Sequence, residues 1–272
     1  MTDLRTKPIP VEIRRALDAA HSSWQPILLE GLHAMAVAYP TYLPELVASD
    51  YLPTEGRLFA AFALPVDVVK YVLVGEGPYP RAASATGVCF MDGAVGGLWS
   101  AAGLSKQVNR ATSLRNFMKM LLVADGQLAI EKTTGDAMGE VALRAQEVDS
   151  ATIQTLADLQ ENLTAEGFLL LNATLVFRPT VAPVREAKPW LPFLQVVLSG
   201  LIAHGEKGSV RLPTLVLWGK IAEQLNALAS TAQFPKVVAE HPYNLSFIGS
   251  VEMQALFGPM HLLRKRSGIG KP

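Results

Sequence analysis

The sequence predicts a three-layer α/β/α protein, in which helices cover both faces of a central, mainly parallel four-stranded sheet. Four short runs rich in Val and Leu occur along the chain, and helical patterns separate them. Strands that alternate with helices build a parallel sheet, and nearly continuous hydrophobicity is typical of strands buried on both faces. The four runs are residues 68–75 (VVKYVLVG), 167–176 (GFLLLNATLV), 213–219 (PTLVLWG) and 236–242 (KVVAEHP).

The helices are predicted from the spacing of apolar residues and from the positions of helix-breaking prolines. Residues 1–51 form an N-terminal helical segment, broken at Pro26 and Pro40, which we expect to pack on the same domain. Residues 52–265 form the α/β domain, and residues 266–272 a basic tail. Helical periodicity predicts helices from Ser113 onward and from about Ser250. Further helices are predicted over residues 150–166, 189–203 and 220–229. Residues 124–148 mix glycine, charge and alternating apolar residues, which predicts a small hairpin or a surface loop.

Composition limits the classes of function. A chain of 272 residues, 50% of them hydrophobic, buries a large core as one α/β domain or two small ones. Lys+Arg and Asp+Glu number 24 each, so no overall basic field attracts DNA, and any DNA contact must be weak and local. The single cysteine, Cys89, excludes an internal disulfide and a cysteine-rich zinc site. We expect a protein that needs no metal or organic cofactor.

The ends and apolar segments of the chain bear on location. The charged start MTDLRTKPIPVEIRR lacks the apolar core of a signal peptide. The longest apolar segment, at residues 191–203, is shorter than the roughly 20 residues that span a bilayer. We therefore expect a cytoplasmic monomer without a membrane segment, and a buried helix at residues 191–203.

The loop after the first predicted strand is a candidate site. It carries Gly75, Gly77, Pro78 and Pro80 at the carboxyl end of a strand, where open α/β sheets bind their ligands. The glycines are not continued into G-x-G-x-x-G, and no Lys-Ser or Lys-Thr completes a phosphate-binding loop. An alternative is that the glycines only supply positive φ angles in a turn.

Three polar residues stand at the ends of predicted strands: Glu76, Asn172 and His241. Taken singly, an Asn at a strand end often bonds nearby backbone, and a His before a Pro is often a turn residue. Together they predict one crevice at the carboxyl edge of the sheet, shared with the loop of residues 75–80.

Four motifs, GEGPY…GVCF, LLLNATLV, LVLWG and HPYNLS, resemble those of the uracil-DNA glycosylase superfamily in order and spacing, particularly its uracil-N-glycosylase branch. The resemblance runs from about Leu52 to about Lys265. In that branch a phenylalanine follows the tyrosine of the first motif by eleven residues, and Tyr79 and Phe90 keep this interval. The resemblance implies a uracil-DNA glycosylase-like fold acting on a base flipped out of DNA.

The resemblance also implies roles for individual residues in reading the base. Phe90 would stack on the flipped base, and Asn172 would hydrogen-bond its Watson–Crick edge. Tyr79 would crowd the position of a thymine methyl, and Gly77 would line the same base site. His241 would donate a hydrogen bond to the negative charge that develops on the base oxygen.

For DNA contact, the resemblance implies that Leu245 fills the gap left in the duplex. Ser113 and Ser246 would hold the flanking phosphates. The implied partner is DNA, single-stranded or double-stranded.

The first motif differs from that of the uracil-N-glycosylase branch at the position of the water-activating residue and at two positions near it. Its Gly-Gln-Asp-Pro-Tyr-His pattern has Glu76 in place of the glutamine, Gly77 in place of the water-activating aspartate, and Pro80 in place of the histidine. Glu76 is the acid left to position water, so His241 and Glu76 are the candidate catalytic residues. Later in the chain, Tyr243 and Asn244 replace the Ser-Pro of the branch's His-Pro-Ser-Pro-Leu-Ser loop.

The sequence Gly-Glu-Gly-Pro resembles the first motif of iron–sulfur glycosylases, but one cysteine is too few to hold an iron–sulfur cluster. We therefore expect a divergent uracil-DNA glycosylase-like protein that hydrolyses, slowly, the N-glycosidic bond of a flipped uracil or damaged base. A catalytically inactive homologue that binds a DNA base or a protein is the alternative. An unrelated nucleotide-binding α/β protein is the third hypothesis.

Overall fold

Ten α-helices, six strands and seven short 3-10 helices make up the part of the chain that the structure describes. The structure is a computed structural model and describes residues 9–207 and 211–266. Residues 1–8 of the predicted N-terminal segment and 267–272 of the predicted basic tail lie outside the described residues.

The main sheet has four strands in the order β4-β1-β5-β6. Strand β1 pairs with β4 in parallel, and the register places Gly75 opposite Asn172 at the last position of both strands. The four strands are β1 (Tyr71–Gly75), β4 (Phe168–Asn172), β5 (Thr214–Trp218) and β6 (Lys236–Ala239). The predicted α/β fold with a four-stranded central sheet is confirmed.

The remaining strands, β2 (Trp99–Ser100) and β3 (Gly103–Leu104), form a short antiparallel hairpin that the sequence reading did not predict. The α-helices are α1 (Val11–Ala16), α2 (Gln25–Ala38), α3 (Tyr42–Val47), α4 (Lys106–Arg110), α5 (Thr112–Ala124), α6 (Gly135–Ala145), α7 (Leu156–Ala165), α8 (Pro183–Lys207), α9 (Lys220–Asn226) and α10 (Val251–Phe257). Short 3-10 helices include η3 (Arg57–Phe62) and η6 (Leu245–Gly249).

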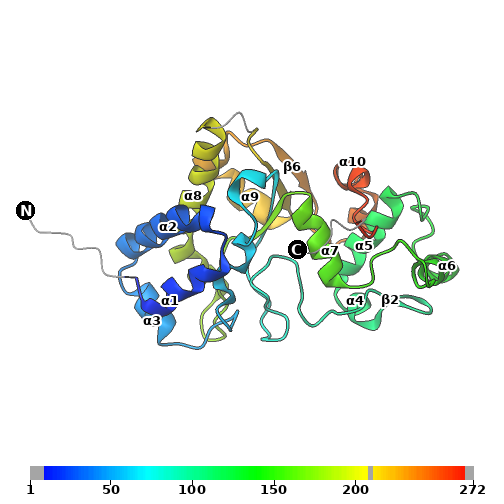
Figure 1. Cartoon of the computed structure of the whole chain (residues 1–272), viewed down its shortest axis with the longest axis horizontal. Helices are drawn as coiled ribbons and strands as arrows, with labels where there is room; N and C mark the ends of the chain where they lie inside the picture. Colours follow the sequence, from blue (N-terminus) through cyan, green and yellow to red (C-terminus); the bar gives the residue numbers. More distant parts are fainter. Residues whose placement is uncertain (1–8, 208–210, 267–272) are drawn as a thin grey trace, which may run out of the picture. The chain divides into compact units, whose positions relative to one another are not determined.

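The chain divides into two compact units, each assembled from segments that are distant in the sequence. Unit 1 comprises residues 1–93, 167–216 and 223–236, and unit 2 comprises residues 94–166, 217–222 and 237–272. In unit 1, α2 packs across α8 (Figure 1), because two glycines let the helices approach closely. A β-carbon on Gly31 would lie 2.7 Å from the ring of Phe193, and one on Gly200 would lie 2.8 Å from Ile27.

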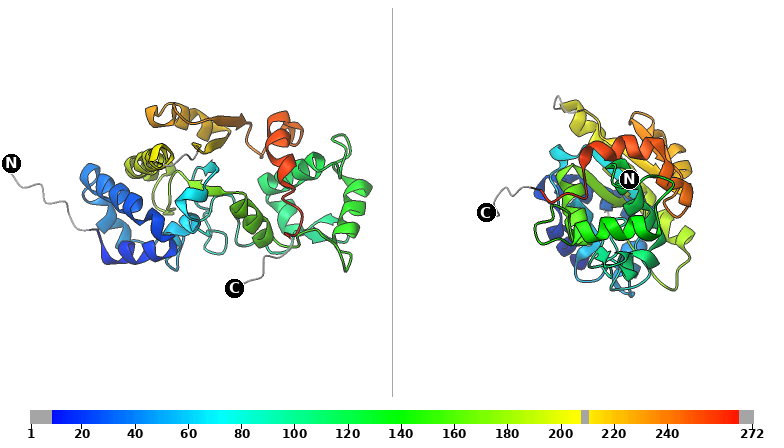
Figure 2. Two further views of the ribbon diagram at one scale, coloured as in Figure 1. Left: turned by 45° about the horizontal axis from the view of Figure 1, so that its top comes forward. Right: turned by 90° about the vertical axis from the view of Figure 1, so that its right-hand side faces the viewer.

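Unit 2 is built around the amphipathic helix α5, which packs against η6 and α10 (Figure 2). The ring of Phe117, on α5, lies 5.7 Å from that of Trp218 and 5.1 Å from that of Phe257, between ring centroids. Buried aromatic pairs at this spacing supply a large share of a small core's stability. This core fixes α5 next to the chain segment that follows β6.

The structure corrects the reading of residues 124–148, which we expected to form a hairpin or a loop. Residues Gly135–Ala145 form helix α6. Its buried residues, Met138, Val141, Ala142 and Ala145, follow the spacing of one helical face. The two glycines of GDAMGEVALRA weaken helix propensity, so burial of this face decides the conformation.

Other boundaries also differ from the prediction. Helix α7 begins at Leu156 rather than near Ser150, because Thr155 and Asp158 form a capping box. Strand β6, expected to be buried on both faces, lies at the edge of the sheet and is only partly buried. The proline predicted to break the N-terminal helix, Pro26, instead lies in the first turn of α2, where a missing N–H costs nothing.

Candidate active site

The end of strand β1 is packed tightly against two side chains. A β-carbon on Gly75 would lie 2.5 Å from the Cys89 sulfur and 3.0 Å from the Asn172 Oδ1 atom. Neither Gly75 nor Gly77 has a φ in the left-handed range, so the alternative that they serve a turn by positive φ is wrong. Gly75 is needed because only a hydrogen fits between the backbone and these side chains.

Asn172 ends β4 and is held by backbone pairing that continues past the strand. The Ala173 N–H donates to the Gly75 carbonyl at 2.8 Å, and the Thr174 N–H donates to the Glu76 carbonyl at 3.1 Å. The Asn172 side chain is only 4% exposed, yet its amide makes no hydrogen bond with any other residue in the described ranges. The enclosed polar atoms that lack a partner in the described residues do not include those of Asn172, so its amide is still accessible and can hydrogen-bond a ligand.

Tyr79 and Phe90 contact each other in the chain segment that follows β1. The Tyr79 hydroxyl reaches the Phe90 carbonyl at 3.5 Å, the long limit of a hydrogen bond. Burial raises the pKa of Tyr79 above its usual range, and the nearby Cys89 and Asp92 add to the rise. Phe90 is half-buried and has a φ of 68°. A non-glycine residue in this region costs about 1–3 kcal/mol and is concentrated at functional sites.

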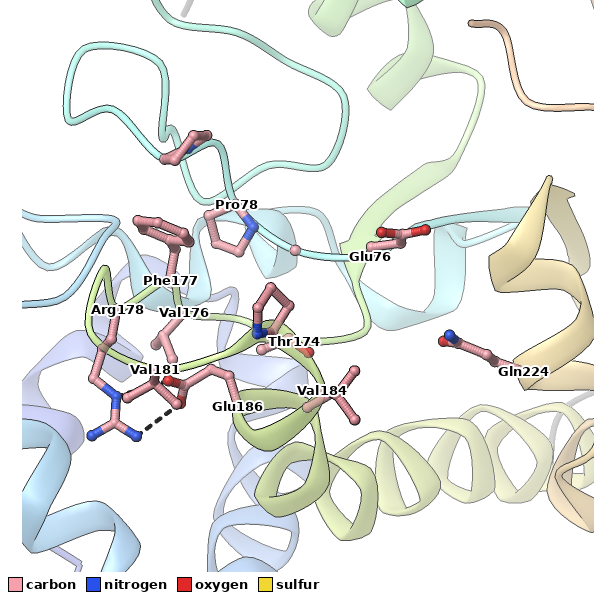
Figure 3. Close-up of a pocket in the computed structure, with 14 residues that line it drawn as sticks. Glu76, Pro78, Thr174, Val176, Phe177, Arg178, Val181, Val184, Glu186 and Gln224 are labelled. Atoms are coloured by element: carbon pink, nitrogen blue, oxygen red, sulfur yellow. Dashed lines mark hydrogen bonds and ion pairs between the residues drawn. The ribbon is translucent and has the colours of Figure 1, made fainter. Parts of the chain in front are cut away.

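A cavity lies beside Gly77, on the loop that follows β1. It has a volume of about 340 Å³ and is lined by Glu76, Gly77, Pro78 and the segment that follows β4 (Figure 3). Glu76 is exposed at this pocket. A β-carbon on Gly77 would lie 3.5 Å from the Thr174 carbonyl oxygen, which is ordinary contact.

A buried ion pair forms one wall of this pocket. Arg178 donates to both carboxylate oxygens of Glu186, at 2.8 and 3.1 Å, and Tyr42 donates to the same carboxylate. The Trp190 indole donates to the Tyr42 hydroxyl at 2.7 Å. Because Glu186 is 3% exposed, these bonds satisfy a charge that would otherwise be very costly to bury. The network therefore holds the wall rigid.

One candidate residue of unit 2, His241, lies on the loop after β6. His241 accepts a hydrogen bond at Nδ1 from the Tyr243 N–H, at 3.1 Å. A ring nitrogen that accepts carries no proton, so the neutral ring has its proton on Nε2. His241 is therefore set up to donate from Nε2.

A side chain of α5 holds the loop that carries His241. Asn116, which is fully buried, donates through its amide to the carbonyl of Pro242 at 2.7 Å, and more weakly to those of Tyr243 and Asn244 at 3.3 and 3.4 Å. The sequence reading missed Asn116, because these partners lie more than a hundred residues away along the chain. This amide sets the path of the backbone that carries His241.

The expected DNA-contacting residues differ in their surroundings. Leu245 is 68% exposed at the start of η6, as a wedge residue requires. Ser246 donates its hydroxyl to the carboxylate of Glu240, and Asn244 donates to the same oxygen at 3.2 Å. Ser113 is half-buried in the first turn of α5.

The candidate site residues fall into two groups. Unit 1 carries Glu76, Gly77, Tyr79, Phe90 and Asn172, and unit 2 carries Ser113, His241, Leu245 and Ser246. The convergence of both groups on one cleft stays a prediction.

Comparison with known proteins decides the family. The crystal structure of wild-type UNG from Nitratifractor salsuginis is 38% identical, with a TM-score of 0.84, over 96% of this chain and 99% of that one. The chain belongs to the uracil-DNA glycosylase family. A uracil-DNA glycosylase from Flavobacterium johnsoniae is 28% identical over 232 residues, which are 83% of this chain and 85% of that protein. One from Corynebacterium glutamicum is 26% identical over 246 residues, 85% and 84% of the two chains.

Two further comparisons add only a likeness of fold and a search without a match. A mimivirus UNG variant in complex with UGI shares the fold at 16% identity, with a TM-score of 0.52 over 85% of this chain and 73% of that one. No protein-family model matches the chain. Within residues 9–207 and 211–266, no helix has the length and apolar character needed to cross a bilayer.

Proposed function

We propose that the chain removes uracil from DNA by hydrolysing the N-glycosidic bond between the flipped base and its deoxyribose. The observation that carries this proposal is the amide of Asn172 in a member of the uracil-DNA glycosylase family: the residue is 4% exposed, and its amide makes no hydrogen bond to another described residue and is still accessible to a ligand. A side-chain amide offers one acceptor and two donors. It therefore matches the neighbouring N–H and C=O groups on the Watson–Crick edge of uracil.

The neighbours of Asn172 support this assignment. Phe90 supplies an aromatic face for stacking, and its strained backbone indicates a position maintained for function. Tyr79 is held beside it and would exclude the methyl group of thymine. We assign base recognition to these three residues.

His241 would stabilise the departing base. In the tautomer set by the Tyr243 N–H, the Nε2 atom donates a hydrogen bond to the base oxygen on which negative charge develops. Removing one such donor typically costs about 10²–10³-fold in rate.

Gly77 lacks the carboxylate that activates water in the branch resembled, and Glu76 is the acid that remains in the loop. A general base contributes about 10²–10⁴-fold, whereas preorganised electrostatics is usually the larger contribution. We therefore propose slow hydrolysis rather than none.

DNA would be held weakly in the cytoplasm by a monomer. Leu245 would enter the base stack, and Ser113 would contact a phosphate. The balance of 24 basic and 24 acidic residues gives no long-range attraction, so binding should fall steeply with salt.

The test is uracil release from single-stranded and double-stranded oligonucleotides, detected by strand cleavage after alkali. We expect product from the parent chain. The rate of uracil release should be lower by about 10²-fold or more in His241→Ala and in Asn172→Ala. Substrates containing hypoxanthine or xanthine would reveal a different preferred base. Absence of product from every substrate at high enzyme concentration would contradict the proposal.

The missing carboxylate at Gly77 favours a second candidate, a base-binding homologue without turnover. That protein would bind uracil-containing DNA more tightly than undamaged DNA and release no base. The same oligonucleotides in a binding assay separate the two candidates.

A further inference from the structure

The pocket beside Gly77 is lined by Thr174, and the proposed function gives the hydroxyl of this residue no role. Residue 77 faces Thr174, since a β-carbon there would lie 3.5 Å from the Thr174 carbonyl oxygen and 3.7 Å from its Cβ. Both residues line the pocket of about 340 Å³. Figure 3 shows Thr174 in the pocket wall, with Glu76 on one side and the Arg178–Glu186 pair on the other. Thr174 is therefore the side chain next to the space left by the absent carboxylate.

The Thr174 hydroxyl is available to whatever fills this pocket. The residue is 6% exposed, and its hydroxyl makes no hydrogen bond to protein within the part of the chain that the structure describes. Its backbone is fixed, because the Thr174 N–H donates to the Glu76 carbonyl at 3.1 Å. The hydroxyl is not among the enclosed polar atoms that lack a partner in the described residues, so it is accessible from the pocket, where water can hydrogen-bond it.

The charged groups of the far wall are already committed. Arg178 and Glu186 bind each other through two hydrogen bonds, and Glu186 also accepts from Tyr42. An ion pair satisfied in this way has little left with which to orient water. Glu76, on the same loop as Gly77, is exposed at the pocket.

We propose that Thr174 positions the attacking water in this pocket and that Glu76 accepts its proton, in place of the missing aspartate. The proposal rests on the proposed uracil-releasing function. The bond between C1′ and the base nitrogen breaks, and its electron pair leaves with the uracil anion, which His241 stabilises. The water oxygen then bonds to C1′, and its proton passes to the Glu76 carboxylate and on to solvent.

The test is a double-mutant comparison of single-turnover uracil release. Thr174→Val keeps the shape of the side chain and removes the hydroxyl, and Thr174→Ser keeps the hydroxyl. We expect Thr174→Val to slow release by about 10²-fold, as for a misplaced reactant, and Thr174→Ser to stay within a few fold of the parent. Thr180→Val, an exposed threonine that does not line the pocket, is the matched control.

The decisive measurement repeats Thr174→Val in a Gly77→Asp background. There a carboxylate holds the water, so we expect loss of the hydroxyl to cost less than about threefold. A merely structural role would slow both backgrounds equally, and that result would overturn the proposal. Binding of uracil-containing DNA should not change in any variant.

The remaining outcomes separate this inference from the function on which it rests. If the parent releases uracil and Thr174→Val releases it equally fast, Thr174 has no such role while the glycosylase function stands. If the parent releases no uracil, the proposed function fails and the role of Thr174 fails with it. Thermal melting of each variant confirms that the comparison is between folded proteins.

Discussion

The last residue of β1, Gly75, lies directly against the side chain of Asn172, with room for no heavy atom between them. A β-carbon at Gly75 would come within 3.0 Å of Asn172 Oδ1 and within 2.5 Å of the Cys89 sulfur. The register of β1 and β4 places these residues opposite each other. The position of the Asn172 side chain is thus set by strand pairing, and a single methyl group at Gly75 should disturb it.

Gly75→Ala should therefore damage the base site more than the fold. The new methyl group forces Asn172 and Cys89 to move, at a cost of about 1–3 kcal/mol in the free energy of unfolding. We expect uracil release to fall much further than this stability loss explains, measured as release rate beside urea unfolding. Gly96→Ala is the control, because a β-carbon there meets nothing within 4 Å. Equal release by Gly75→Ala and the parent would contradict the assigned position of Asn172.

Asn116→Ala should loosen the loop that carries His241. Its amide is the donor to the Pro242 carbonyl at 2.7 Å, and an unpaired buried carbonyl costs about 1–3 kcal/mol. We expect that loss of stability together with a fall in uracil release like that of His241→Ala. Denaturant unfolding and release rates measure the two effects.

Asn162→Ala is the matched control for Asn116. Asn162 is also a buried amide, and it donates to the carbonyls of Leu262 and Arg264 at 2.7 and 2.8 Å, outside the His241 loop. It should lower stability by a similar amount and leave release by the folded protein unchanged. Parallel losses of activity in both variants would show that Asn116 acts through stability alone.

Glu240→Gln should increase affinity for DNA. The Glu240 carboxylate accepts from Ser246 and Asn244, so it places a negative charge beside residues expected to approach phosphates. Removing an exposed charge changes binding by about 0.2–1 kcal/mol, or roughly 1.4-fold to fivefold at low ionic strength. Fluorescence anisotropy with labelled DNA measures the gain, which should shrink as salt rises.

Glu252→Gln provides the comparison for Glu240. Glu252 is an exposed acid that accepts from Ser250 at 3.0 Å and lies outside the His241 loop. We expect it to change DNA affinity less than Glu240→Gln does. Equal gains from both variants would point to net charge rather than to the position of Glu240.

Cys89 should make the fold sensitive to alkali. Burial raises the pKa of its thiol to about 12, against 9.0 for an ordinary cysteine. The folded chain therefore keeps the thiol proton after the unfolded chain has lost it, so stability is full below pH 9 and declines as pH rises toward 12. Between pH 7 and 10 the parent should lose about 1.4 kcal/mol that Cys89→Ser does not lose. Urea unfolding at both pH values measures this difference, and an equal loss in both proteins would contradict it.

The strands, and the sheet edge at which Gly75 and Asn172 lie, were predictable because their signals are local. The first four residues of β4, FLLL, are all apolar, and the strand is buried at every position. The glycine and asparagine at the ends of β1 and β4 stand next to these runs, so the sheet edge could be located from sequence alone. Side chains that face one another across parallel strand ends follow from the same pattern.

Helix α6 and the contacts of Asn116 and Thr174 depend on tertiary packing. Nothing near Asn116 in the sequence indicates that it binds Pro242, because the contact depends on how α5 packs in unit 2. Thr174 could not be identified from the sequence, because its place beside Gly77 depends on how the segments after β1 and β4 pair. The weak helix signal of GDAMGEVALRA is decided by burial of one face. Such features are set by partners far away in the chain.

Gly77→Asp should convert the pocket beside Thr174 into a faster hydrolytic site. The backbone at Gly77 is not left-handed, and a β-carbon there makes only ordinary contact, at 3.5 Å from the Thr174 carbonyl. The substitution should therefore be tolerated, with a melting temperature close to that of the parent. A carboxylate at this position can orient water and accept its proton, and we expect uracil release to rise by about 10²-fold or more. Gly77→Asn has the same shape without the charge and should give no such gain. If Gly77→Asn accelerates release equally, the benefit comes from filling the pocket. If Gly77→Asp folds, binds uracil-containing DNA and remains as slow as the parent, the rate is limited outside this pocket, at His241 or in the handling of DNA by Tyr243 and Asn244.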